Sequence, residues 1–348
     1  MEKTADFTEG RILSRLLRFA LPVLAALFLQ AMYGAVDLMV VGQFGAPTDV
    51  SAVSTGSQIM QTVTSLITGL AMGITILVGQ KIGEKRPEQA GDVIGSGICL
   101  FGVLAAVLTV LMILGAGFLA GLMHAPDEAF SQTVDYIRIC SAGAVFIIAY
   151  NVLGSIFRGI GDSRMPLFTV AAACVFNIGG DLLLVAGFHM GAAGAALATV
   201  AAQAASVLLS LAVIRRRTLP FTIGKKNLRF ERRLVGRILA LGTPIALQDL
   251  LVSISFLVIL AIVNSMGVIA SAGVGVAEKL CAFIMLVASA YMQSMSAFVA
   301  QNMGAGKPER AKRALLYGIG TSLMAGVTLF YFSFFHGDAM AGIFARDP

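Results

Sequence analysis

The chain has 348 residues, of which 57% are hydrophobic and 13% charged, with a net charge of +6 and a mean hydropathy of +0.87. Soluble domains carry about 25% charged residues, so this composition excludes an ordinary soluble protein and predicts one embedded in a bilayer. Apolar runs of roughly 20 residues, long enough to cross the hydrocarbon layer, recur along the sequence. Their continuity and their Ala, Leu and Gly content favour helices over the short alternating strands of a membrane barrel.

Nine membrane-spanning helices are predicted, in chain order, near residues 19–41, 53–80, 93–121, 134–157, 166–188, 191–214, 239–264, 276–300 and 314–335. The first apolar run follows three arginines, as the core of a signal peptide would. It is longer than such a core, however, and leads directly into polar residues, so we interpret it as an uncleaved span. The fold class expected is therefore an all-α membrane protein.

One stretch of the sequence occurs twice. Residues 78–90 recur at 299–311 with six of thirteen positions identical, and both copies contain Gln-x-x-Gly, at Gln80 to Gly83 and at Gln301 to Gly304. A duplication of this length in an apolar chain is typical of secondary transporters built from two repeats. We expect a six-helix lobe over residues 1–214, a basic cytoplasmic linker over 215–237 and an incomplete three-helix lobe over 238–348.

Basic residues gather at alternate ends of successive predicted helices, with Arg138, Lys279 and Arg346 as the exceptions. The positive-inside rule then places the N-terminus in the cytoplasm. Because the first repeat contains an even number of spans, six, the second repeat enters the membrane in the same orientation as the first. The linker is expected either to bind anionic headgroups or simply to be solvated. The second copy ends after its third span, so we also expect a truncated chain, after about nine of twelve helices.

Acidic side chains inside the predicted spans indicate where function lies. An aspartate at mid-bilayer costs about 2.5–3.5 kcal/mol even on lenient scales, so one found there normally faces the interior of the protein. Asp37 lies well inside the first span and shares a helical face with Gln30 and Gly34. Asn177 and Asp181, four residues apart in the fifth span, likewise point in the same direction.

An ordered set of motifs along the whole chain resembles the multidrug and toxic compound extrusion (MATE) transporters. The set comprises Leu21-Pro22, Val36-Asp37 with Val41-Gly42, the two Gln-x-x-Gly motifs, Arg158-Gly159-Ile160-Gly161-Asp162-Ser163-Arg164-Met165-Pro166, Asn177 with Asp181, and Gly242-Thr243-Pro244-Ile245-Ala246-Leu247-Gln248. The resemblance implies two six-helix lobes and export of organic cations or other amphipathic compounds in exchange for sodium ions or protons.

The resemblance also implies a cation site of the N-terminal lobe at Asp37, Asn177, Asp181 and Thr199. Carboxylate, amide and hydroxyl oxygens are ligands that small hard cations prefer. Two carboxyl groups in a desolvated cavity repel one another when both are ionised, so the same pair can instead exchange a proton. The sequence leaves Na⁺ and H⁺ both open, and a plain hydrogen bond between helices remains the alternative.

Further polar residues are weaker candidates for lining a cavity. Asn151 in the fourth span is one, and Gln248 at the start of the seventh is another. Asp249 departs from the pattern of similar family members, which place a glutamate where this chain has Val252. We expect Asp249 to be either a second protonatable group or a hydrogen-bonding residue, and both alternatives stay open. The four cysteines have no paired spacing, which favours neither a metal site nor a disulfide.

We therefore expect an ion-coupled antiporter of small amphipathic or cationic molecules. It would be a monomer of the inner membrane in contact with lipid, with no cofactor and no nucleic-acid partner. One alternative is a lipid-linked oligosaccharide flippase of the same superfamily, although the predicted spans are poor in the basic residues that would bind pyrophosphate. A membrane enzyme would need a catalytic cluster that the sequence lacks. A truncated fragment without transport activity is the third alternative.

Overall fold

The computed structural model describes residues 6–217, 219–221, 224, 226–264 and 268–336. Regular structure in these ranges is helical throughout. The helices are α1 (Ile12–Phe44), α2 (Pro47–Gly83), α3 (Pro87–Leu122), α4 (Phe130–Ala142), α5 (Ala144–Gly159), α6 (Arg164–Asp181), α7 (Gly191–Arg216), α8 (Arg232–Asn264), α9 (Val268–Gly304) and α10 (Pro308–Phe335), with a 3₁₀ turn η1 (Asp127–Ala129) and a π-helical segment η2 (Leu182–Gly187).

Proline starts three of these helices. Pro47, Pro87 and Pro308 occupy the first positions of α2, α3 and α10. Proline suits this place because the first N–H groups of a helix have no intrahelical partner and its φ angle is already helical. The chain can therefore turn tightly between spans.

Eight helices of the described ranges are long and apolar enough to cross a membrane, and the bent pair formed by η1–α4 and α5 makes a ninth. This count confirms the predicted nine spans. The fourth span was predicted as continuous over 134–157, which is wrong in detail, because the chain bends by 52° near Gly143. A Cβ atom at Gly143 would collide with the side chain of Val200, so glycine here lets α7 pack closely against the bend.

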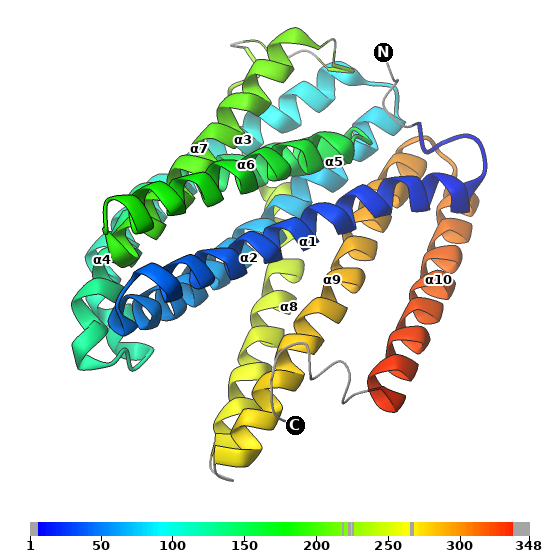
Figure 1. Cartoon of the computed structure of the whole chain (residues 1–348). Helices are drawn as coiled ribbons and strands as arrows, with labels where there is room; N and C mark the ends of the chain where they lie inside the picture. The colour runs from blue at the N-terminus through cyan, green and yellow to red at the C-terminus, as the bar shows by residue number, and fades with distance from the viewer. Residues whose placement is uncertain (1–5, 218, 222–223, 225, 265–267, 337–348) are drawn as a thin grey trace.

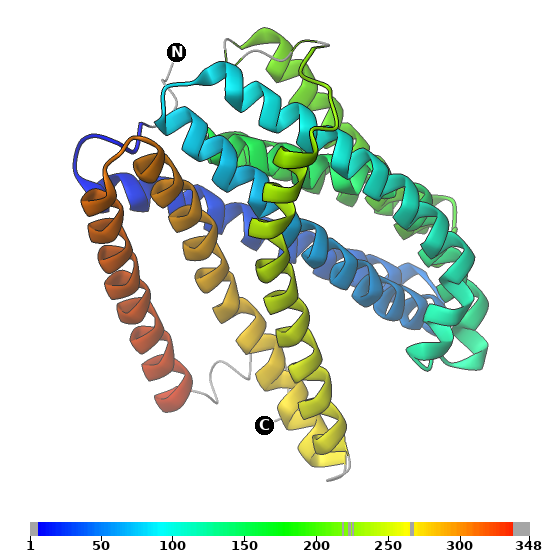
Figure 2. The same ribbon diagram turned by 180° about the vertical axis from the view of Figure 1, so that it is seen from behind.

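The two predicted lobes are visible as two groups of helices. Figure 1 shows α1 to α7 running in one direction and α8 to α10 crossing them at an angle, and Figure 2 shows the same crossing from behind. The groups meet where α2 packs against α8 and α9, and where α1 packs against α9. All of the connections that the sequence marks as basic lie at one end, beside the N-terminus, which we call the basic end (Figure 1). Away from that end the two groups diverge.

The duplicated motif forms part of the contact between the groups. Gly83 faces the carbonyl oxygen of Gln301, and Gly304 faces that of Gln80, so closely that a Cβ atom on either glycine would overlap the opposing backbone. Small residues allow such close approach of two helices. The Nε2 of Gln301 also donates to the carbonyl oxygen of Gly159, at 3.0 Å. The two copies of the motif thus form a reciprocal contact between the repeats. We call this contact, of Gly83 with Gln301 and of Gly304 with Gln80, the glycine crossing.

Residues 6–10 precede α1 and lie against the other group of helices. The ring of Phe7 is fully buried, with its centroid 5.0 Å from that of Phe19 on α1 and 4.9 Å from that of Phe298 on α9. Its backbone oxygen accepts hydrogen bonds from Asn302 (3.2 Å) and Arg310 (3.0 Å). This segment therefore ties the start of α1 to α9 and α10.

The described part of the linker packs onto α3. Asn227 donates from Nδ2 to Asp92 Oδ1 at 2.7 Å, and Ser96 donates to the backbone oxygen of Arg229 at 3.0 Å. Helix α8 starts at Arg232, inside the segment predicted as linker. The predicted domain limits and the predicted affinity for headgroups stay predictions.

Replacing Gly304 by alanine should destabilise the protein by about 1–3 kcal/mol, because the added methyl group overpacks the glycine crossing. The measurement is the thermal unfolding midpoint of the detergent-purified protein. Gly326→Ala is the matched control, since a Cβ there meets open space and alanine is better than glycine in a helix by about 1 kcal/mol. Equal shifts in the two variants would contradict the packing described.

Candidate functional site

The candidate site lies where α1, α6 and α7 pack together. Asp37 on α1 is 5% exposed, while Asn177 and Asp181 on α6 are 1% and 0% exposed. Thr199 on α7 is half-buried beside them. The structure therefore brings together the four residues for which the resemblance implies a cation site. Their role as a site stays a prediction.

A chain of hydrogen bonds joins the three helices. Thr199 donates from Oγ1 to Asp37 Oδ2 at 3.3 Å, and Asn177 donates from Nδ2 to Thr199 Oγ1 at 3.4 Å. The carboxyl group of Asp181 lies within interaction range of the carboxyl group of Asp37. Two carboxylates so placed repel one another unless a proton or a cation lies between them.

Several oxygens of this group have no hydrogen-bond donor among the described residues. They are Asp37 Oδ1, Asn177 Oδ1 and both carboxyl oxygens of Asp181. A buried acceptor without a donor costs about 1–3 kcal/mol, and more when it is charged. Such a set of oxygens fits a bound Na⁺ or an added proton, either of which would satisfy them. Within the described residues, no three His, Cys, Asp or Glu side chains are arranged to hold a metal ion.

A second polar layer lies one helical turn nearer the basic end, and the sequence reading missed it. Gln203 on α7, 6% exposed, donates from Nε2 to the hydroxyl oxygen of Tyr33 on α1 at 3.2 Å. The spacing in the sequence could have predicted this layer, because Tyr33 lies four residues before Asp37 and Gln203 four residues after Thr199. Polar residues four apart lie on the same helical face.

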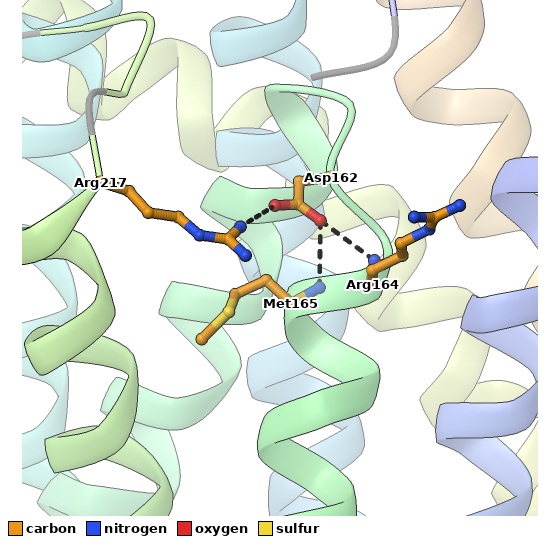
Figure 3. A network of polar contacts seen from close by, with 4 residues as sticks. All are labelled: Asp162, Arg164, Met165 and Arg217. Atoms are coloured by element: carbon orange, nitrogen blue, oxygen red, sulfur yellow. Dashed lines mark hydrogen bonds and ion pairs between the residues drawn. The ribbon is translucent and has the colours of Figure 1, made fainter. Parts of the chain in front are cut away.

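Two features of the chain position α6. The π-helical segment η2 begins directly after Asp181, and such segments are frequent at functional sites. At the other end Asp162 accepts hydrogen bonds from the backbone N–H groups of Arg164 (3.1 Å) and Met165 (3.0 Å), which caps the helix. Its second oxygen pairs with Arg217, just after α7, at 3.3 Å (Figure 3). One carboxylate thus fixes α6 and α7 together at the basic end.

The weaker candidates are not all brought to this group. Gln30 interacts with Tyr33, and Gly34 faces open space. Asn151 instead accepts from Thr68 Oγ1 at 2.9 Å and donates to a carbonyl oxygen of its own helix. Its polar atoms are satisfied between α2 and α5, and its predicted place in a cavity stays a prediction.

Gln248 and Asp249 lie on α8, in the other group of helices. Gln248 is exposed and Asp249 is half-buried. Over the described residues, helix α8 makes no contact with α1, α6 or α7. The structure therefore separates these two residues from the Asp37 group, and their predicted roles stay predictions.

Comparison with known families decides the classification. The MatE family model matches residues 22–183 and 244–348. The chain belongs to this family. The resemblance read from the motifs is thereby confirmed.

Relatives of this MATE protein include the probable multidrug resistance protein YoeA of Bacillus subtilis, 28% identical over 94% of this chain and 73% of the relative. A protein named FAD transporter, from Shewanella oneidensis, is 26% identical over 97% of this chain and 75% of its own length. A crystal structure of MATE in complex with MaL6 superimposes with a TM-score of 0.92 at 22% identity, covering 100% of this chain and 77% of that one. This similarity confirms the all-helical fold. These comparisons do not establish the predicted truncation, and it stays a prediction.

Replacing Asp181 by asparagine should stabilise the protein in alkaline, sodium-free buffer by about 1–3 kcal/mol, because the new amide can donate to Asp37. The unfolding midpoint measures this. Acidification should remove the difference, since a proton supplies the same donor to the unaltered pair. The exposed Glu128 provides the control: Glu128→Gln should leave the unfolding midpoint unchanged in both alkaline and acidic buffer. A variant less stable than the unaltered protein in alkaline buffer would contradict this account.

Proposed function

We propose that this MATE protein is a secondary antiporter that exports organic cations or other amphipathic small molecules in exchange for Na⁺ or H⁺. The observation that carries the proposal is the buried pair Asp37 and Asp181, on different helices, with three carboxyl oxygens that lack a donor among the described residues. A group of this kind changes its net charge when an ion or a proton arrives. It can therefore couple the ion gradient to a change of conformation.

The proposed coupling step depends on the cost of burying charge. With no ion bound, the two carboxylates and the side-chain oxygen of Asn177 are desolvated and repel each other. Binding of Na⁺ or H⁺ lowers the charge and lets α1 pack closely on α6 and α7. Pro22 lies inside α1 and removes one backbone hydrogen bond, which gives this helix a place to bend. The membrane potential adds about 2.3 kcal/mol per charge per 100 mV.

Relatives support export of small molecules as the activity. Several are named multidrug resistance or multidrug export proteins, and one is named a FAD transporter. The range of these names supports a class of amphipathic compounds as substrate and does not single out one compound. Neither the flippase nor an enzyme is favoured by any of these relatives, and we propose no cofactor.

Orientation follows from the distribution of charge. We place the basic end in the cytoplasm by the positive-inside rule, in an inner membrane and with lipid around a single copy of the chain. The glycine crossing would then hold the two groups of helices together on the cytoplasmic side. Export would require this crossing to open, so that substrate can enter from the cytoplasm.

Replacing Asp37 by asparagine should abolish ion-coupled export, because the pair loses the charge that the ion neutralises. The measurement is efflux of a fluorescent organic cation from proteoliposomes under a sodium gradient and, separately, under a pH gradient. The gradient that drives export by the unaltered protein identifies the coupling ion. Loss should exceed tenfold, the effect of about 1.4 kcal/mol.

Asp127 supplies the control, since it is exposed and lies outside the site; Asp127→Asn should export at the unaltered rate. Membrane insertion and the unfolding midpoint of Asp37→Asn show whether it folds. Undiminished export by Asp37→Asn would contradict the proposed coupling. An unaltered protein that exports under neither gradient would contradict the proposed function itself.

A further inference from the structure

Residues 6–10, which we call the N-terminal strap, have a defined conformation of their own. Asp6 Oδ1 accepts hydrogen bonds from the backbone N–H of Thr8 at 2.8 Å and from its hydroxyl group at 2.6 Å. At the other end Gly10 has a φ angle of +72°, which glycine adopts without strain. The first residues of a chain are usually poorly ordered unless they are tied down. These two turns direct the strap from the start of α1 toward α9 and α10.

The backbone of the strap is bound by basic side chains of the group formed by α8 to α10. Arg310 on α10 donates from Nε to the oxygen of Phe7 at 3.0 Å and from Nη2 to that of Glu9 at 2.7 Å. Lys307, directly before α10, donates from Nζ to the oxygen of Thr8 at 3.0 Å. The strap is joined covalently to α1, so it connects one group of helices to the other.

One glutamine links the strap to the glycine crossing. Gln301 on α9, which is 1% exposed, accepts a hydrogen bond at Oε1 from the backbone N–H of Phe7 at 3.4 Å. Its Nε2 donates to the carbonyl oxygen of Gly159 at the end of α5, and its backbone oxygen faces Gly83 on α2. The strap and the crossing therefore share a residue at the basic end.

The strap lies across a boundary that opens in the proposed transport cycle. The ring of Phe7 is packed between Phe19 of α1 and Phe298 of α9, one helix from each group. When α9 and α10 move away from α1 and α2, the strap cannot keep its contacts on both sides. The chain holds it to α1, so the contacts with α9 and α10 are the ones that can break.

We propose that the N-terminal strap is a latch that holds the basic end closed and detaches from α9 and α10 when the glycine crossing opens. The inference rests on the proposed function, in which the crossing opens to admit substrate. Burial of the Phe7 ring favours the closed state, because apolar surface is removed from water. Release is reversible, since Arg310 is partly and Lys307 fully exposed, and water replaces the backbone oxygens as their partner.

Two pairs of spin labels measure opening and release separately in the detergent-purified full chain, after the four native cysteines are replaced by alanine. Labels at Glu88 on α3 and Lys312 on α10 report the separation of the two groups of helices. Labels at Glu9 and Lys312 report whether the strap stays on α10. All three side chains are exposed. Electron paramagnetic resonance gives the distribution of each distance, and the two pairs should show a longer distance in the same fraction of molecules.

Weakening the strap should favour the open state. Phe7→Ala removes the buried ring, and Arg310→Gln removes the charged donor to two backbone oxygens. Each should raise the ratio of open to closed protein about tenfold, the effect of about 1.4 kcal/mol. Phe44→Ala and Arg313→Gln are the matched controls, because they make the same changes at exposed side chains outside the strap. They should leave the ratio within about twofold of the unaltered value.

Two results would overturn the proposal. One is a longer distance between Glu88 and Lys312 with an unchanged distance between Glu9 and Lys312, because the strap would then move together with α10. The other is a ratio of open to closed protein that either Phe7→Ala or Arg310→Gln, once shown to fold by its unfolding midpoint, leaves unchanged or lowers. The paired distances are measured with the rest of the strap unaltered, so a variant that fails to fold does not remove the answer.

The distance measurements do not depend on transport. An unaltered protein that exports under neither gradient, but whose two distances lengthen together, would contradict the proposed antiport and leave the latch standing. Normal export by a protein whose strap stays on α10 would contradict the latch alone.

Discussion

Polar groups in this protein must find partners inside the protein, because the hydrocarbon around the spans offers none. Backbone groups meet this requirement by forming helices. Buried hydroxyl groups meet it by bonding to the carbonyl oxygen four residues earlier, as Thr133, Ser141, Ser210 and Ser294 do. Against this background a buried polar atom without a partner is conspicuous. Of the eight such side-chain atoms in the described residues, five belong to Asp37, Asn177, Asp181 and Gln203.

These exceptions are not spread evenly over the described residues. Five acceptor atoms gather on Asp37, Asn177, Asp181 and Gln203, whereas the other three, on Gln132, Arg158 and Asn302, lie on separate helices. The acceptors around Asp37 are therefore left for a group that the described residues do not supply. In the proposed mechanism that group is a cation or a proton.

The sequence was sufficient to predict the helical fold and part of the candidate site, but not the finer contacts of either. Long apolar runs, spaced charges and repeated motifs predicted the nine spans. Helical spacing placed Asn177 and Asp181 on one face, but only the resemblance to MATE transporters joined Asp37, Asn177, Asp181 and Thr199 into one group. The sequence could not show that Arg158 belongs to the last turn of α5, because the ends of helices are the least certain part of a sequence-based prediction. Nor could it show that Asn151 is satisfied by Thr68, a residue 83 positions away.

The repeat builds part of the scaffold from matching positions in both halves. Gly83 and Gly304 stand in equivalent places and face each other's repeat, so the close contact at the basic end is built symmetrically from both halves. On α8 the described residues include one carboxylate, Asp249, which lies apart from the Asp37 group. In the proposed mechanism this crossing opens and closes, and two matching surfaces would release and re-form the same contact. Helix α1, which carries Asp37, also packs against α9, so a change at the proposed ion site would reach the other group of helices directly.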